Sequence, residues 1–347
     1  MPDYLMMLNP SVNHVYRSQA AELAAAELAV TADFASDIAP EALGAGVGLR
    51  FSAEEIDELV LAQQSSHMVT FERAGELLRP LDIRSANVMD DDLLTIPKYQ
   101  GKTNEAFTRM LLHLTLSWVD RPGPLDVLDP MTGRGTTLLA AWTAGHNGYG
   151  VEVNGKAFDA MTSYLKTYLR TKRLKHSAEV TPVRREGRSV GRRFDAEVRL
   201  AEATSRTPAR PGMPTLAMTV FTGDTRDSAA LFGKKRFDAI VTDAPYGVVH
   251  GAATDRSQRG ARRCAAPSRE RRPGDLLAEA IPVWRRQLKP GGALGIAWNT
   301  LTLPRAELVS MITDAGLTVV EGEQWQFAHR VDSSIRRDLL VAISKVN

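Results

Sequence analysis

Hydrophobic and polar positions change their period repeatedly along the chain after residue 105. The apolar side chains from Phe107 to Trp118 are spaced for a buried helix over 105–119. Beyond it, short apolar runs alternate with longer amphipathic stretches. The runs predict strands at 125–129, 149–153, 217–222, 237–243, 292–298, 317–327 and 338–344, and the stretches predict helices at 136–145, 156–175, 275–288 and 304–315. This alternation indicates an α/β fold with a doubly wound parallel sheet. Since no helix separates the last two runs, we expect a hairpin that adds one antiparallel strand.

The first 95 residues show a shorter and different pattern. Strand-like runs occur at 4–8, 47–51 and 66–71, and Ala, Leu and Glu dominate a helix-like stretch at 17–29. Ser52, with Glu55 three residues later, fits a capping box at the start of a second helix. Three aspartates at 90–92 mark the end of this region. For a chain of 347 residues, we therefore expect two domains, a small α+β domain over 1–95 and an α/β domain over 96–347.

The net charge of +2 hides an asymmetry between these two parts. Residues 1–97 hold 5 Lys and Arg against 16 Asp and Glu, whereas residues 98–347 hold the other 38 against 25. The basic part suggests a polyanionic partner such as a nucleic acid. A solvated surface that uses Arg in preference to Lys would give the same count, so charge alone leaves both interpretations open.

Two basic segments interrupt the alternation of strands and helices. Residues 170–210 hold 12 Lys and Arg against 5 acids, and residues 250–274 hold 7 Arg against 2 acids. Neither segment shows a strong period, so we expect loop-like insertions. Long loops inside a domain are usually functional or disordered.

The sequence also excludes several classes of protein. No apolar run approaches the roughly 18–20 residues of a membrane helix, and the N-terminus lacks the basic region of a secretory signal. The single cysteine, Cys264, cannot form an intrachain disulfide, which fits a cytoplasmic protein. The seven histidines show no metal-binding spacing, so we expect no metal site.

The first chemical motif follows the strand at 125–129. It reads Asp129-Pro-Met-Thr-Gly133-Arg-Gly135-Thr136, a strand that ends in an acid, a glycine turn and the start of a helix. Glycine lets the backbone approach a ligand closely, and ligands of open α/β sheets bind at the carboxyl ends of the strands. Because the leading carboxylate would repel a pyrophosphate, the turn suits a cationic or amino-bearing ligand. A tight turn without a ligand is the alternative.

Two further strands also end in acids. Glu152 ends the strand after the glycine turn, about 20 residues on, where a carboxylate accepts hydrogen bonds from ribose hydroxyls. Asp224 follows Gly223 after the third strand and suits an adenine amino group. An N-cap for the next helix is the alternative for Asp224.

The strand at 237–243 runs into Asp243-Ala244-Pro245-Tyr246-Gly247, which we interpret as the catalytic motif. Proline fixes the turn and exposes the carbonyl before it. The Asp243 carboxylate and the Ala244 carbonyl are then adjacent acceptors for the two hydrogens of a planar amine, while Tyr246 can stack on the ring that bears the amine. An ordinary turn with a buried tyrosine is the alternative.

Together these motifs resemble a known family. They look like the S-adenosylmethionine-dependent methyltransferases that modify exocyclic amines of nucleic-acid bases, whose motifs read roughly Asp-Pro-Phe-x-Gly-x-Gly and Asp/Asn-Pro-Pro-Tyr. The segment from Lys98 to Asn104 is similar to an extra cofactor motif of this group. With Gly247 as its last residue, the second motif most closely resembles that of the tRNA guanosine N2-methyltransferases that act near position ten. The resemblance covers about residues 97–346, and Ala244 replaces the first Pro of the second motif.

The resemblance implies a Rossmann-like methyltransferase sheet of seven strands, the last one antiparallel, and S-adenosylmethionine as the cofactor. It implies a catalytic group of Asp243, Ala244, Pro245 and Tyr246. From the residues themselves we expect substrate contacts from Tyr246, from His250 in the loop after the catalytic motif, and from Arg262 and Arg263 in the basic segment 250–274. An incidental position is the alternative for His250. The residues that the resemblance assigns to the cofactor are Lys98, Thr103, Asp129, Met131, Thr132, Gly133, Gly135, Thr136, Glu152, Val153, Gly223, Asp224, Thr225 and Asp243.

The expected substrate is guanine N2 of tRNA or another structured RNA. DNA adenine-N6 or cytosine-N4 methylation, a small-molecule or peptide N-methyltransferase, and a binding module without activity are the alternatives. The polar segment from Gln326 to Asp338 could line the substrate side, but we interpret it as a solvated turn.

Overall fold

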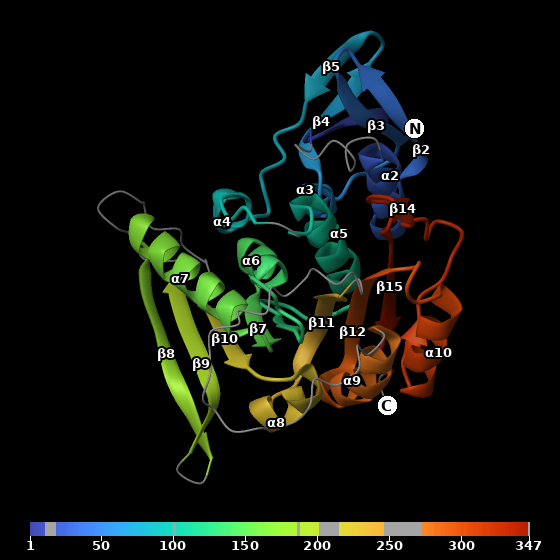
Figure 1. The fold of residues 1–347 in the computed structure, drawn as a ribbon. Helices are drawn as coiled ribbons and strands as arrows, with labels where there is room; N and C mark the ends of the chain where they lie inside the picture. Colours follow the sequence, from blue (N-terminus) through green and yellow to red (C-terminus); the bar gives the residue numbers. More distant parts are fainter. Residues whose placement is uncertain (11–18, 100–101, 186–187, 201–214, 246–272, 346–347) are drawn as a thin grey trace.

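A computed structural model describes residues 1–10, 19–99, 102–185, 188–200, 215–245 and 273–345 (Figure 1). In these residues the larger of two sheets has the strand order β13-β15-β12-β11-β6-β7-β10-β9-β8. Its strands in chain order are β6 (Asp126–Asp129), β7 (Asn147–Glu152), β8 (Lys175–Arg185), β9 (Arg188–Arg199), β10 (Thr215–Thr222), β11 (Phe237–Asp243), β12 (Leu288–Asn299), β13 (Thr318–Val319), β14 (His329–Arg330) and β15 (Arg336–Ile343).

The centre of this sheet confirms the doubly wound α/β prediction. β10, β7, β6, β11 and β12 pair in parallel, and β15 is antiparallel to β12 and β13, as expected for the final hairpin. The strand predicted at 317–327 is wrong in length, because only the two residues of β13 pair and the chain then leaves the sheet until β14.

Helices cover both faces of the sheet (Figure 1). α5 (Glu105–Leu116), α6 (Thr136–Thr143) and α7 (Gly155–Thr171) lie on one face, and α8 (Ser228–Phe232), α9 (Pro273–Gln287) and α10 (Arg305–Asp314) lie on the other. Apolar residues of the strands alternate between the two faces, so each helical layer has its own core. No described helix is long and apolar enough to cross a membrane.

The basic segment 170–210 is not the loop that the sequence suggested. Its described part forms the long antiparallel hairpin β8–β9, which extends the sheet beyond β10. Phe194, Ala196 and Val198 face the core at every second position, and the basic residues occupy mainly the exposed positions. Arg192 pairs with Asp159 and stacks on Phe158, so part of the basic charge is neutralised locally.

The smaller sheet belongs to the N-terminal residues and has the order β2-β3-β1-β4-β5. Its elements are β1 (Asp3–Leu8), α2 (Ala20–Thr31), β2 (Ser36–Leu43), β3 (Gly46–Ser52), α3 (Glu58–Gln63), β4 (His67–Ala74) and β5 (Leu77–Pro80). The predicted capping box at Ser52 is wrong. Ser52 ends β3 and donates a hydrogen bond to Asp3, whereas Asp57 caps α3 with its carboxylate.

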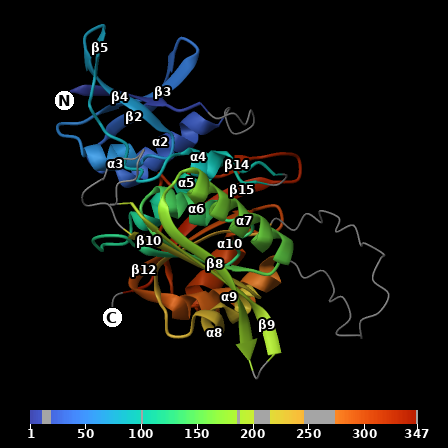
Figure 2. The same ribbon diagram turned by 90° about the vertical axis from the view of Figure 1, so that its left-hand side faces the viewer.

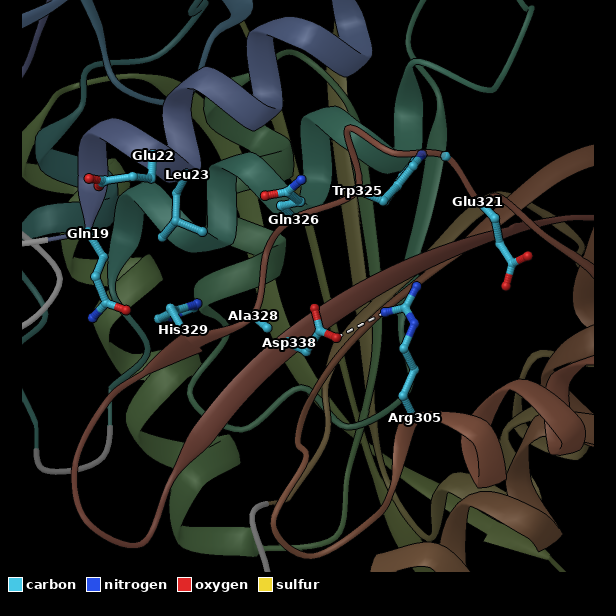
Figure 3. Close-up of a pocket in the computed structure, with 11 residues that line it drawn as sticks. Gln19, Glu22, Leu23, Arg305, Glu321, Trp325, Gln326, Ala328, His329 and Asp338 are labelled. Carbon is cyan, nitrogen blue, oxygen red and sulfur yellow. Dashed lines mark hydrogen bonds and ion pairs between the residues drawn. The ribbon is translucent and has the colours of Figure 1, made fainter. Parts of the chain in front are cut away.

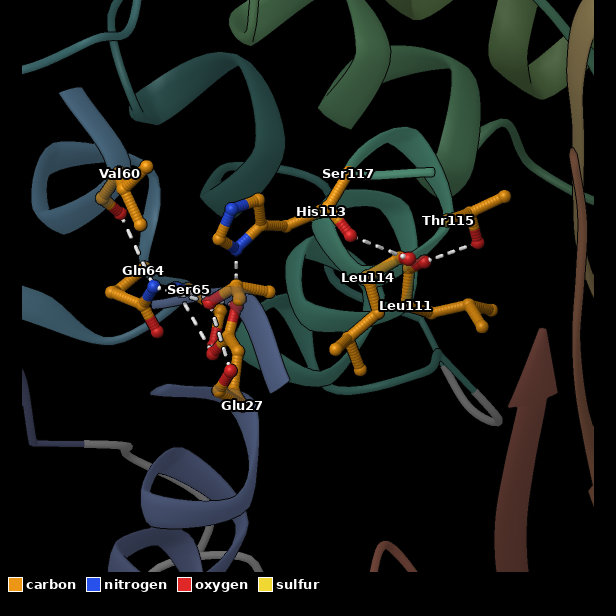
Figure 4. Close-up of polar contacts among 10 residues, drawn as sticks. Glu27, Val60, Gln64, Ser65, Leu111, His113, Leu114, Thr115 and Ser117 are labelled. Atoms are coloured by element: carbon orange, nitrogen blue, oxygen red, sulfur yellow. Dashed lines mark hydrogen bonds and ion pairs between the residues drawn. The ribbon is translucent and has the colours of Figure 1, made fainter. Parts of the chain in front are cut away.

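The N-terminal helix α2 packs on α5 of the larger sheet through a buried acid (Figure 4). Glu27 accepts hydrogen bonds from the backbone and hydroxyl of Ser65 and lies 2.9 Å from Nδ1 of His113 on α5. Leu23 and Ala26 of the same helix join the core formed by α5, α6 and α7. A short helix, α4 (Asp92–Thr95), contacts α7, where the Tyr164 hydroxyl donates a hydrogen bond to the Leu93 carbonyl. Figure 2 shows the N-terminal sheet and the β8–β9 hairpin at opposite ends of the molecule.

Candidate active site

The predicted acids meet at the carboxyl edge of the larger sheet. β6 and β11 are neighbours, and the chain leaves β6 toward β7 on one side but returns to β11 on the other. This reversal is the topological switch point at which open α/β sheets bind ligands. Asp129 ends β6 and Asp243 ends β11, so both lie at this point, and Glu152 ends the adjacent strand β7.

Asp129 is buried and tightly held. Its Oδ1 accepts hydrogen bonds from the Thr242 hydroxyl at 2.8 Å and from the Met131 backbone at 3.1 Å. Burial raises the pKa of Asp129 to about 7, although these hydrogen bonds oppose the shift. The Thr132 hydroxyl donates to the Asp129 carbonyl and so fixes the start of the turn.

The glycine turn requires both of its glycines for different reasons. Gly133 has φ +56° and an added Cβ would meet no atom within 4 Å, so the turn faces open space there. Gly135 has φ +87° at the N-cap of α6, and an added Cβ would lie 2.7 Å from Sδ of Met161. A side chain at Gly135 would therefore both strain the backbone and push α7 away. Thr136 opens α6, as the sequence predicted.

Glu152 joins the end of β7 to the glycine turn. Its two carboxylate oxygens accept hydrogen bonds from the backbone of Gly133 and of Asn154, each at 2.6 Å. Burial raises the pKa of Glu152, and these two hydrogen bonds oppose the shift. The next residue, Val153, is 76% exposed, which leaves an apolar side chain uncovered beside the acid.

Asp224 and Thr225 follow β10 at the same edge, and the structure gives both of them internal partners. The Asp224 carboxylate caps the short helix η1 (Thr225–Asp227) and forms an ion pair with Arg226. The Thr225 hydroxyl accepts a hydrogen bond from the indole of Trp284. Gly223 donates its backbone N–H to the Glu152 carbonyl, which ties β10 to β7.

Asp243 receives contacts from two segments that are distant in the sequence. The Thr103 hydroxyl donates a hydrogen bond to Oδ2 of Asp243, and a guanidinium nitrogen of Arg337 lies 3.9 Å from the same oxygen. The backbone N–H of Ala244 donates to the carbonyl of Ala297 in β12, and Pro245 is exposed. The predicted substrate residues Tyr246, His250, Arg262 and Arg263 lie outside the described residues.

The segment before α5 closes the other side of the turn. The Tyr99 hydroxyl hydrogen-bonds the Thr136 hydroxyl at 2.7 Å, and the guanidinium of Arg134 lies 4.7 Å from the Tyr99 ring centre. Lys98 is exposed, and Thr103 contacts Asp243. The sequence pointed to this segment and to the turn, but it did not single out Tyr99 or Arg134, which lies within the glycine turn and contacts the Tyr99 ring.

The interpretation of residues 326–338 as a solvated turn is wrong at its ends. His329, Arg337 and Asp338 are buried, because β14 and β15 return the chain to the sheet, whereas residues 332–334 are exposed. Figure 3 shows His329 and Asp338 beside a cavity of about 740 Å³, with Asp338 paired to Arg305 at 2.9 Å. No group of acidic, His or Cys side chains in the described part of the chain is arranged to hold a metal ion.

Comparisons with known proteins find only distant similarities. No family model matches this sequence, and no curated protein matches it either. Among solved structures, TrmN from Thermus thermophilus is 13% identical with a TM-score of 0.45, over 99% of this chain and 100% of that one. The rRNA methyltransferase aviRa from Streptomyces viridochromogenes is 12% identical with a TM-score of 0.39, over 76% and 94% of the two chains.

A TehB-like SAM-dependent methyltransferase from Corynebacterium glutamicum is also similar, at 13% identity and a TM-score of 0.34, over 65% of this chain and 83% of that one. Similarities this distant assign no activity or substrate. The function has to come from the residues of the site itself.

Proposed function

We propose that this chain is an S-adenosylmethionine-dependent N-methyltransferase that acts on an exocyclic amine of a nucleic-acid base. The substrate that we favour is guanine N2 in tRNA or another structured RNA. The observation that carries the proposal is the meeting of Asp129 and Asp243 at the ends of adjacent strands, at the switch point of the sheet, with Glu152 on the next strand. Asp129 and Glu152 suit the cofactor, and Asp243 suits the amine of the substrate.

The residues at the glycine turn fit S-adenosylmethionine, which is cationic at its sulfur and carries a ribose and an adenine. Open space at Gly133 admits a ligand against the backbone, and the Asp129 carboxylate accepts a hydrogen bond from the Met131 backbone at the start of the same turn. Glu152 stands where its carboxylate can accept hydrogen bonds from ribose hydroxyls. The exposed Val153 offers an apolar surface for the adenine ring.

The chemistry at Asp243 follows from its place beside this turn. When bound, S-adenosylmethionine supplies a methyl group on a positively charged sulfur. Asp243 and the Ala244 carbonyl would accept hydrogen bonds from the two amine hydrogens and turn the nitrogen lone pair toward that methyl. The lone pair would form the N–C bond as the S–C bond breaks and S-adenosylhomocysteine leaves, and the cationic nitrogen would then release one proton to water. Because the charge develops on the nitrogen, both hydrogen bonds strengthen in the transition state.

A nucleic acid as the substrate is supported by charge and by the direction of the β8–β9 hairpin. Arg193 pairs with Phe221 near the carboxyl end of β10, so the hairpin continues past that end on the side of the sheet where the site lies. Arg184 is exposed in this overhanging part. A basic arm beside the site can contact phosphates while the target base enters the pocket.

The test is a comparison of polymers. The protein is incubated with methyl-labelled S-adenosylmethionine and, separately, with total RNA, tRNA and DNA, and the digested nucleosides are analysed by mass spectrometry. We expect label in N2-methylguanosine from the RNA samples. Label in N6-methyldeoxyadenosine or N4-methyldeoxycytidine from DNA would move the proposal to DNA, and label in no nucleoside would contradict it.

Asp243→Ala supplies the matching variant. Loss of one transition-state acceptor should lower turnover by roughly a hundredfold, or about 3 kcal/mol, by analogy with the loss of one oxyanion-hole donor. Asp314→Ala, at an exposed position at the end of α10, is the control and should keep full turnover. Equal turnover of the two variants would exclude Asp243 from the reaction.

A further inference from the structure

We infer that Arg337 is a positioning residue for methyl transfer, because it holds the Asp243 carboxylate in one orientation. The inference rests on the proposed function of Asp243. Nothing in the sequence motifs points to Arg337, which lies in the final hairpin, far along the chain from the two motifs that carry the chemistry. The antiparallel pairing of β15 with β12 brings it to the carboxyl edge, opposite Asn299.

Arg337 is placed as a buried cation. Its side chain is 6% exposed, and its guanidinium lies 4.9 Å from the ring centre of Phe107 on α5. The ring of Phe107 in turn contacts that of His329 at 4.9 Å between centres. An aromatic face stabilises a guanidinium but does not neutralise it, so a buried arginine of this kind needs an acid nearby.

The acid that the structure provides is Asp243. Side chains alternate across a strand, and the neighbouring Asp338 faces the opposite side of β15, where it pairs with Arg305. Arg337 faces the α5 side, where a guanidinium nitrogen lies 3.9 Å from Oδ2 of Asp243. The charge of Arg337 is therefore directed at the proposed catalytic acid rather than at its own neighbour in the strand.

A second contact makes this arrangement directional. The Thr103 hydroxyl, which comes from the segment before α5, donates to the same Oδ2. Two groups from different elements thus act on one oxygen of the carboxylate and restrict its rotation about the Cβ–Cγ bond. Restricting that rotation matters because a reacting nitrogen must be aimed at the methyl carbon, and a misplacement of about 1 Å can cost roughly a hundredfold in rate.

A role in packing alone makes a different prediction. If Arg337 only fills space against Phe107, an apolar side chain of similar length should serve equally well. If it positions Asp243, the positive charge is needed and turnover should suffer while cofactor and substrate binding remain. The two roles therefore separate in the split between kcat and KM.

The experiment compares Arg337→Met, Arg337→Lys and the control Arg336→Met, which removes the same charge from the exposed neighbouring position. We expect Arg337→Met to lower kcat by roughly tenfold to a hundredfold, with the KM for RNA and the Kd for S-adenosylmethionine unchanged within about threefold. Arg337→Lys should recover part of the loss, and Arg336→Met should keep the wild-type kcat. Wild-type kcat in Arg337→Met, or a loss in kcat, KM and Tm together that Lys does not relieve, would overturn the inference.

A second measurement does not depend on activity. In a double-mutant cycle, the free energy of unfolding is compared for the wild type, Arg337→Met, Asp243→Asn and the double variant. Coupling between the two changes supports the pair, and strict additivity overturns it. If the wild type methylates no nucleic acid, the proposed function fails, whereas additivity in the cycle is a failure of this inference alone.

Discussion

Thr242 donates its hydroxyl to Oδ1 of Asp129 at 2.8 Å and so links β11 to the acid at the end of β6. Both side chains are buried. The hydrogen bond spans the switch point of the sheet, one residue before Asp243. This hydroxyl therefore adds a side-chain link between the cofactor side and the amine side of the proposed site, beside the pairing of β6 with β11.

Removing that hydroxyl should weaken both the fold and the binding of the cofactor. Thr242→Val leaves the buried Asp129 without one of its donors, which should lower the free energy of unfolding by about 1.5–3 kcal/mol. Thr219→Val is the matched control, since it removes an equivalent Thr–Asp hydrogen bond, to Asp195, on β10 away from the site. Calorimetry should show weaker S-adenosylmethionine binding in Thr242→Val alone, and equal affinities in both variants would contradict the link.

Glu152→Gln tests the acid at the end of β7. The substitution keeps the shape, but it turns an acceptor for the Gly133 or Asn154 backbone into a donor. Loss of a hydrogen bond to a charged group corresponds to roughly tenfold to a hundredfold weaker S-adenosylmethionine binding. Glu179→Gln, at an exposed position on β8, should bind as the wild type does. Calorimetric titration of both folded variants decides the question.

Gly135→Ala tests the geometry of the turn. The control is Gly316→Ala, just after the end of α10, where φ is +81° but an added Cβ meets no atom within 4 Å. The control should lose only about 1–2 kcal/mol of the free energy of unfolding, which is the cost of holding alanine in a left-handed backbone conformation. Gly135→Ala adds the contact with the Met161 side chain and should lose more stability and also cofactor affinity. Equal losses in the free energy of unfolding, measured with urea, would show that the Met161 side chain on α7 moves aside at no cost in stability.

The raised pKa of Asp129 predicts a specific pH dependence of stability. Because burial raises the pKa of Asp129 to about 7, the folded protein holds this proton up to about pH 7, whereas the unfolded chain releases it near the ordinary aspartate pKa of 3.8. The stabilisation from this group is therefore complete below about pH 4 and is lost as the pH rises through 7. Relative to Asp129→Asn, which does not titrate, the wild type should lose on the order of 2 kcal/mol between pH 5 and pH 8. The free energy of unfolding of both proteins is measured with urea at each pH. If it changes by the same amount between pH 5 and pH 8 in the two proteins, this titration is ruled out.

Arg184 tests the contribution of the hairpin to RNA binding. Arg184→Ala should weaken RNA binding uniformly across sequences and reduce the salt slope of binding by about one. Arg199→Ala is the control, because Arg199 lies at the opposite end of the hairpin and pairs with Glu197. Binding titrations over a series of salt concentrations measure both. Identical slopes for the two variants would remove the hairpin from the RNA-binding surface.

The acids at the strand ends were predictable from the sequence because each combines two local signals. Asp129, Glu152 and Asp243 all follow a short apolar run and precede a turn, and parallel strands bring such positions to one edge. The longer helices on the larger sheet, α5, α6, α7, α9 and α10, were predicted to within a few residues, since their apolar faces repeat with a regular period, whereas the short helix α8 was not predicted.

Other features had no local signal or a misleading one. The hairpin β8–β9 does alternate at Phe194, Ala196 and Val198, but its dense charge concealed the period. Ser52 satisfies the pattern of a capping box, yet the pairing of β3 with β1 extends the strand through that residue. The contact of Arg337 with Asp243 depends on strand pairing between distant segments, which a single sequence does not reveal.

The order of strands in the larger sheet also governs how the protein is made. β6 and β7 leave the ribosome long before β11, which occupies the position between β6 and β12. The edge of β6 that pairs with β11 therefore stays unpaired while the hairpin and the segments after it are synthesised. Thr103 and Asp243, 140 residues apart, meet only when β11 docks. The proposed site is thus completed late, and an incomplete chain exposes an open strand edge that favours association with other nascent chains.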